Sequence, residues 1–264
     1  MKEKRKLNKG GKILLLFTLV VSSIFLLRPF TVKADVNVNI NKETQIVTDL
    51  IGQYSINYTG DANFFGFYGY YENNNYNEMV KDTDFKATVD TIGKDKIVNS
   101  SIASLKKTDG ATQIEAAYLV WETSVQGKNN TDLVKKAANK AVYFAGSTDK
   151  GAFTKKVNAS YAAVDMREPH LGTKEYTFSC MYVDVTSVVQ KYGYGKYGVA
   201  NIPYAASMKT SNTDKGTHAG ESSSAWQLIV IEKNSKANVR AVSLKIGSHF
   251  NYQQENSKWT RNPL

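Results

Sequence analysis

Four short segments of the chain are rich in β-branched and aromatic residues and have the two-residue period of β-strands. In the last of them, apolar Val242, Leu244 and Ile246 are separated by polar residues, as in a strand with one face on a core and one in water. The segment that begins at Ala225 is apolar on both faces, which predicts a central strand. The predicted strands are Glu115–Thr123, Thr177–Val185, Ala225–Lys233 and Val239–Gly247.

Two short segments have a helical pattern instead. Residues 184–193 offer Asp184 as an N-cap, apolar residues at helical spacing and Gly193 as a stop, and residues 131–140 are the second predicted helix. Only four prolines occur, and the composition does not change after residue 35, which favours one domain. The predicted fold class is all-β: a two-sheet antiparallel β-sandwich, jelly-roll-like, with one or two short helices.

The first 34 residues have the pattern of a secretory signal peptide. Residues 1–12 carry six Lys or Arg against one Glu, and residues 13–27 are uncharged and apolar but short for a membrane span. Val32 and Ala34 suit a signal peptidase, so cleavage is predicted after Ala34, with an uncleaved anchor as the alternative. The prediction is a secreted or cell-surface protein that meets the membrane only through the signal peptide before cleavage.

Removal of the signal peptide changes the charge of the chain. The 34 basic residues fall to 26 and the 24 acidic residues to 23, so a net charge of +10 falls to +3. The remaining Lys residues are scattered rather than gathered in a stripe, so no nucleic-acid partner is predicted. The predicted organisation is signal peptide 1–34, polar lead segment 35–44, β-sandwich domain 45–250 and C-terminal tail 251–264.

The residue types that carry metal or thiol chemistry do not form a motif. Cys180 has no partner for an internal disulfide and is predicted to be a buried, inert thiol. His170, His218 and His249 lack metal-binding spacing, so no cofactor is predicted. Calcium stays open at the short acidic segments 81–84 and 147–151, although no motif supports it.

Paired acids would indicate a glycosidase only under a geometric condition. Asp82 with Asp84, or Glu115 with Glu122, would have to lie about 5 to 10 Å apart across a cleft. Glu115, among apolar neighbours, could instead promote a Lys–Asn isopeptide bond, for which no set of residues is specified. The prediction is a protein that is not an enzyme.

Trp121 and Trp226, on strands with aliphatic neighbours, are predicted core residues.

An aromatic stretch, residues 63–78, holds seven aromatic rings in sixteen residues. Its pattern predicts half of a β-hairpin followed by a turn at residues 73–75, with the Phe side chains inward and the Tyr side chains partly exposed. Displayed aromatic side chains suit binding or self-association. The candidate residues for such a surface are Tyr68, Tyr70, Tyr71, Asn73, Asn74 and Tyr76.

Four motifs, in order, resemble a known family of domains: residues 116–124 (AAYLVWETS), 182–203 (YVDVTSVVQKYGYGKYGVANIP), 225–234 (AWQLIVIEKN) and 240–250 (RAVSLKIGSHF). Together they resemble the non-catalytic N-terminal β-sandwich domain of large Gram-positive surface proteins of the adhesin or fimbrial type. The resemblance implies a structural or adhesive role, with the extracellular matrix, a host surface or other copies of the chain as partners. A carbohydrate-binding module or a glycan-active secreted enzyme is the alternative.

Overall fold

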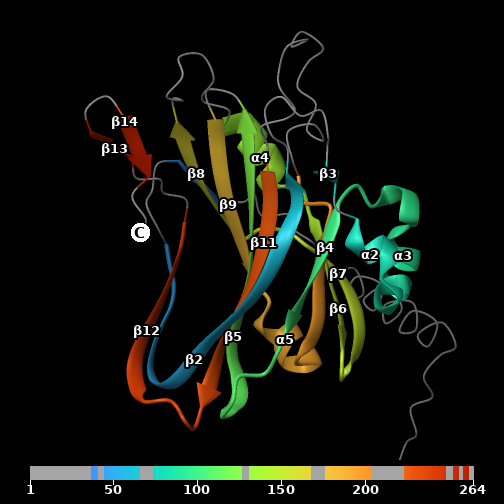
Figure 1. Ribbon diagram of the computed structural model, residues 1–264, viewed down its shortest axis with the longest axis vertical. Coiled ribbons are helices and arrows are strands. Elements are labelled where there is room, and N and C mark those ends of the chain that lie inside the picture. Colours follow the sequence, from blue (N-terminus) through green and yellow to red (C-terminus); the bar gives the residue numbers. More distant parts are fainter. Residues whose placement is uncertain are drawn as a thin grey trace, which may run out of the picture. The chain divides into compact units, whose positions relative to one another are not determined.

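The computed structural model describes residues 37–40, 45–65, 74–75, 77–126, 131–167, 176–203, 223–247, 252–255 and 258–261, all within one unit, Val36–Leu264. Most of these residues are in strands (Figure 1). The larger sheet contains, in spatial order, β1 (Asn37–Ile40), β8 (Tyr161–Arg167), β9 (Tyr176–Asp184), β5 (Ala111–Gln126), β11 (Ser223–Asn234), β2 (Gln45–Phe65) and β12 (Val239–Ile246). β3 (Asn74–Asn75) also pairs with β2.

The smaller sheet has the order β4 (Ser100–Leu105), β10 (Gly195–Ala200), β6 (Val142–Thr148) and β7 (Gly151–Val157). β13 (Tyr252–Glu255) and β14 (Lys258–Arg261) pair only with each other among the described strands. Within the described ladders of the two sheets, β1–β8 is parallel and the others are antiparallel. The predicted two-sheet antiparallel sandwich is therefore confirmed.

The four strands predicted from alternation correspond to β5, β9, β11 and β12. β11 lies between β5 and β2, as its apolar character on both faces predicts. Leu228 and Val230 point into the core between the sheets, whereas Ile231 belongs to a second core on the opposite face. One face of β11 is therefore buried between the sheets, and its other face is covered at Ile231 but exposed at Gln227.

The two predicted helices are present as α4 (Thr131–Ala138) and α5 (Thr186–Tyr192). The N-cap of α5 is Val185 rather than the predicted Asp184, whose carboxylate accepts a hydrogen bond from the backbone N–H of Thr186, and Gly193, at φ 73°, ends the helix. Four short elements were not predicted: α2 (Glu78–Lys81), η1 (Thr83–Phe85), α3 (Lys86–Ile92) and η2 (Lys94–Lys96). α2, η1 and η2 have only three or four residues, too few to show a helical period, and burial of Met79, Phe85 and Ile92 against the smaller sheet holds this segment in place.

The main core fills the space between the two sheets. Trp121 and Trp226, predicted as core residues, are 0% and 3% exposed and are register partners on β5 and β11. Phe144, Phe153 and Tyr197 face them from the smaller sheet, with the rings of Phe144 and Tyr197 stacked at a centroid distance of 5.6 Å. Side chains from both sheets thus share one apolar cluster, which holds the sandwich together.

A buried polar network crosses this core from β2 to β4. Asn63 Nδ2 donates to Asn99 Oδ1 at 2.9 Å, and Ser101 Oγ donates to Asn63 Oδ1 at 2.6 Å. Trp226 Nε1 completes the network by donating to Ser101 Oγ at 2.8 Å. By contrast, Trp121 Nε1 has no hydrogen-bond partner among the described residues. The two indoles are therefore equally buried but differ in their hydrogen bonding.

This difference predicts unequal effects of two matched substitutions. Trp226→Phe and Trp121→Phe remove similar amounts of buried indole, so their packing losses should be comparable. Only Trp226→Phe also leaves the Ser101 hydroxyl without its donor, which should add roughly 1–3 kcal/mol to the loss of unfolding free energy. Denaturant unfolding of both variants measures the difference. Equal losses would mean that the Trp226–Ser101 hydrogen bond contributes nothing to stability.

Candidate association surface on the β2–β12 arm

Strand β2 changes its pairing partner half-way along its length. From Tyr54 to Phe65 it pairs with β11, and from Gln45 to Gln53 it pairs with β12. Residues 235–238 join the end of β11 to the start of β12. The ladder of β12 with the first half of β2 therefore begins where the ladder of β2 with β11 ends. Figure 1 shows β2 running beside β12 at the lower left and then bending upward beside β11. We call β12 together with Gln45–Gln53 the arm.

The arm folds back over the larger sheet because the chain before it is short. Four residues separate Ile40, the end of β1, from Gln45, the start of β2, so these two residues lie at most about 18 Å apart. In a flat sheet β1 and β2 would be five interstrand steps apart, or about 24 Å. The larger sheet must therefore curl, which brings the arm over the face opposite the smaller sheet.

The inner face of the arm closes a second apolar core. Val242 and Ile246 of β12 belong to one cluster with Tyr118, Tyr161 and Tyr182 of the larger sheet. The rings of Tyr118 and Tyr182 meet edge to face at 6.4 Å, and those of Tyr161 and Tyr182 lie 5.5 Å apart. Burial raises the pKa of Tyr118 and of Tyr182, so these hydroxyls stay protonated. The arm is thus packed onto the sheet rather than projecting freely.

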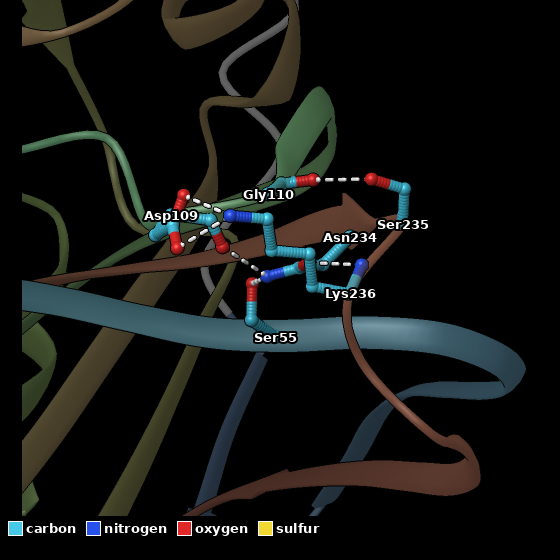
Figure 2. Close-up of polar contacts among 6 residues, drawn as sticks. All are labelled: Ser55, Asp109, Gly110, Asn234, Ser235 and Lys236. Atoms are coloured by element: carbon cyan, nitrogen blue, oxygen red, sulfur yellow. Dashed lines mark hydrogen bonds and ion pairs between the residues drawn. The ribbon is translucent and has the colours of Figure 1, made fainter.

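Asn234, the last residue of β11, fixes the base of the arm. Its Nδ2 donates to the backbone carbonyl of Asp109 at 2.9 Å and to Ser55 Oγ at 3.2 Å, and its Oδ1 accepts from the backbone N–H of Lys236 at 2.9 Å. Figure 2 shows these contacts converging from three separate segments of the chain. We call this group of contacts the junction. It ties together the bend of β2, the β4–β5 connection and the start of the β11–β12 connection.

Gly110 is required at the junction for two reasons. Its φ of 80° is unfavourable for residues with a side chain, and an added Cβ would lie 2.5 Å from Asn234 Oδ1. Ser235 Oγ donates to the Gly110 carbonyl at 3.2 Å, and Lys236 Nζ lies 2.8 and 2.9 Å from the carboxylate oxygens of Asp109 (Figure 2). Because that ion pair is exposed, it adds little to stability. The geometry of the junction comes from Asn234 and Gly110.

A buried carboxylate reinforces the bend. Glu232 is 0% exposed, and its oxygens accept hydrogen bonds from Tyr194 OH at 2.7 Å, Ser55 Oγ at 3.1 Å and Asn57 Nδ2 at 3.4 Å. These donors replace the water that the carboxylate loses on burial. Burial, together with the hydrogen bond to Glu232, raises the pKa of Tyr194. Ser55 contacts both Glu232 and Asn234, so the two networks meet beside the point where β2 changes partner.

The outer face of the arm is exposed and carries three large apolar side chains among polar ones. Ile51 is 81% exposed, Val239 70% and Ile46 55%. In the β2–β12 ladder Ile51 pairs with Ala241, and Val239 pairs with Gln53, so the exposed side chains occupy adjoining positions on one face. Isolated exposed apolar residues are ordinary, but a contiguous group on a rigid element is typical of an interaction site. The sequence pattern did not identify this surface.

The sequence-predicted aromatic surface is only partly within the described residues. Tyr68, Tyr70, Tyr71, Asn73 and Tyr76 lie outside them. Asn74 is in β3, where it pairs with Phe65 in an antiparallel ladder with β2. The predicted turn at residues 73–75 is wrong for Asn74 and Asn75, because their backbones pair with β2. The ligand-binding role of these residues stays a prediction.

The predicted acidic segment 81–84 already holds a cation. Lys196 Nζ lies 2.9 Å from Asp82 Oδ2 and 2.7 Å from Asp84 Oδ2. The hydrogen bond from Lys196 holds the pKa of Asp82 below its usual range. In this structure the ammonium group supplies the positive charge between the two carboxylates. Across the described residues, no group of three or more His, Cys, Asp or Glu is arranged to hold a metal ion.

The other candidate residues are far apart or occupied. Glu115 and Glu122 lie seven residues apart on β5, about 23 Å along the strand, which is too far for a glycosidase pair. Glu115 lies 3.2 Å from Lys233 Nζ. Burial, with a smaller effect of Glu122, raises the pKa of Cys180 to about 12, so this thiol is protonated and unreactive at neutral pH. His170, His218 and His249 lie outside the described residues.

Comparison with known proteins found no matching family model, no matching curated protein and no matching solved structure. The resemblance to Gram-positive surface domains therefore stays a prediction from the sequence. Among the described helices, none is both long and apolar enough to cross a membrane.

The junction predicts a large effect for a single polar substitution. Asn234→Ala removes three hydrogen bonds at a site that is 5% exposed and leaves the Asp109 carbonyl and the Lys236 N–H without this partner. Unfolding free energy should fall by roughly 2–4 kcal/mol. Ser235→Ala, at the neighbouring exposed residue, should change it by less than about 1 kcal/mol. Thermal unfolding of both variants tests this, and equal small losses would mean that the junction does not hold the arm.

Proposed function

We propose that this chain is a secreted or cell-surface structural protein of a Gram-positive bacterium that mediates attachment or assembly through its β-sandwich domain. The observation that carries the proposal is the rigid, exposed apolar face of the arm, with Ile51 at 81% and Val239 at 70% exposure. The signal-peptide pattern supports the extracellular compartment, and the four family-like motifs support a non-catalytic surface role.

The arrangement of the arm fits such a role physically. An exposed apolar group has a favourable free energy of burial that is released only when a partner covers it, about 25 cal/mol for each Å² removed from water. The packed inner face and the junction hold the arm in one position, so little conformational entropy is lost on contact. A surface that is both apolar and fixed is suited to attachment.

The proposal predicts that charge on the arm abolishes attachment without unfolding the protein. The double variant Ile51→Lys/Val239→Lys should keep its melting temperature within a few degrees, because exposed substitutions change stability by about 0.5 kcal/mol or less each. Binding to plates coated with collagen, fibronectin or the protein itself should fall at least tenfold, about 1.4 kcal/mol.

The matched control is Ala152→Lys, which adds a Lys at an exposed position of β7 in the smaller sheet. It should bind like the parent protein. Unchanged binding of the arm variant to every coating, with normal stability, would reject the arm as the attachment surface.

Carbohydrate binding is the second candidate function, and the exposure of Tyr58 favours it. Tyr58 is 68% exposed and lies beside Ile229 in the β2–β11 ladder, so its ring is available on a sheet face. Tyr58→Ser should then weaken retention on immobilised polysaccharides such as cellulose or peptidoglycan at least fivefold while leaving thermal stability nearly unchanged. If retention is absent in the parent protein, this second function is excluded for those polysaccharides.

A further inference from the structure

We propose that the partner covering the outer face of the arm is a second copy of this chain, stacked arm against arm about a two-fold axis. The inference rests on the proposed function, and it names the partner at the same surface. It depends on three features of the arm: where its exposed apolar side chains lie, how its charges are balanced and how its free edge is blocked.

The apolar residues are concentrated on one side of a two-stranded ladder. Ile46, Ile51 and Val239 are each more than half exposed, whereas Val242 and Ile246 on the other side are 5% exposed. Such a face can pack on an identical face, because a two-fold operation places the same apolar residues opposite one another.

The charges on this face favour a copy over a polyanion. Asp49 and Lys245 are both exposed on the outer face, where the pair Asp49–Ser243 and the pair Ile46–Lys245 are separated by a single register pair, Thr48–Leu244. One acid and one base leave the face neutral, so two copies do not repel each other. A wall polymer or nucleic acid would instead be attracted by a face with basic residues alone.

The free edge of β12 is less suited to association than its face. Within the described part of the chain, β12 pairs only with β2, so its other edge has no strand beside it. Lys245 is exposed on this edge strand, and a Lys on an edge strand is a common protection against edge pairing, while the bulge beside it places its extra residue, Val47, on β2. Face-to-face stacking avoids this obstacle, since it needs no continuous backbone ladder.

The size of the face sets the expected strength. Eight register pairs give an arm about 27 Å long and about 10 Å wide, well below the roughly 800 Å² that each partner contributes to a standard stable interface. The dimer should therefore be weak and reversible in solution. At a surface carrying many copies, the same contact becomes effective through multivalency.

Sedimentation velocity over a rising concentration series of the protein tests the inference. The parent protein should pass from monomer to dimer between roughly 10 µM and 1 mM, the range of a small interface. Ile51→Lys/Val239→Lys should stay monomeric throughout, and the Ala152→Lys control should dimerise like the parent. The charge reversal Asp49→Lys should raise the dissociation constant at least fivefold, and adding Lys245→Asp should restore it, because each copy then carries the exchanged pair.

Two results would overturn the inference in distinguishable ways. A parent protein that stays monomeric to 1 mM, while the arm variant still loses binding to collagen or fibronectin, would reject the second copy and keep the attachment function. A dimer that persists in Ile51→Lys/Val239→Lys would show that copies meet through another surface. If the arm variant loses neither dimerisation nor attachment, the proposed function is rejected together with the inference.

Discussion

The side-chain amide of Asn234 ties the base of the arm to β2 and to the β4–β5 connection. A 21-residue strand such as β2 would extend about 70 Å if it were straight, far beyond the width of a single sandwich. It changes partner instead between Gln53 and Tyr54, next to Ser55, whose hydroxyl donates to Glu232 and accepts from Asn234. An amide can donate and accept at once, so a single side chain satisfies the Asp109 carbonyl and the Lys236 N–H across the bend. An apolar residue in the same place would pack but would leave these groups unpaired.

The buried polar groups of the domain therefore have two different roles. At the bend, Ser55 and Glu232 specify where one strand changes partner, which apolar contacts cannot specify because they lack direction. Between the sheets, Asn63 and Ser101 fix how β2 crosses β4. Both networks involve β2, the strand that contributes to the main core, to the arm and to the hairpin with β3. Polar contacts thus hold the strand whose path is least determined by hydrophobic packing.

The fold was predictable where a strand keeps one environment along its length. β11 and β12 each retain a constant relation to the cores, so apolar side chains recur with a clear period. β2 does not, because its partner changes at Tyr54 and its second half buries polar Asn63 while exposing Ile56 and Tyr58. The strands of the smaller sheet are short and contain Gly, Ala and Ser, so their periods are faint. They become strands because the opposite sheet supplies the apolar surface.

The sequence did not predict the candidate surface on the arm, because that surface also lies on a strand whose environment changes along its length. Exposure of Ile51 and Val239 follows from the curl of the sheet, which depends on pairing between segments almost two hundred residues apart in sequence. The sequence pattern instead indicated the aromatic stretch at residues 63–78, whose composition is unusual without any knowledge of the fold.

The curl also places the two faces of the arm in different environments, one buried on the larger sheet and one exposed to solvent. Its inner face is committed to Tyr118 and Tyr182, so the arm cannot turn over to hide its outer face without opening that core. Burial of Ile51 and Val239 therefore has to come from outside the domain. The packing that stabilises the isolated chain is what keeps this candidate surface exposed.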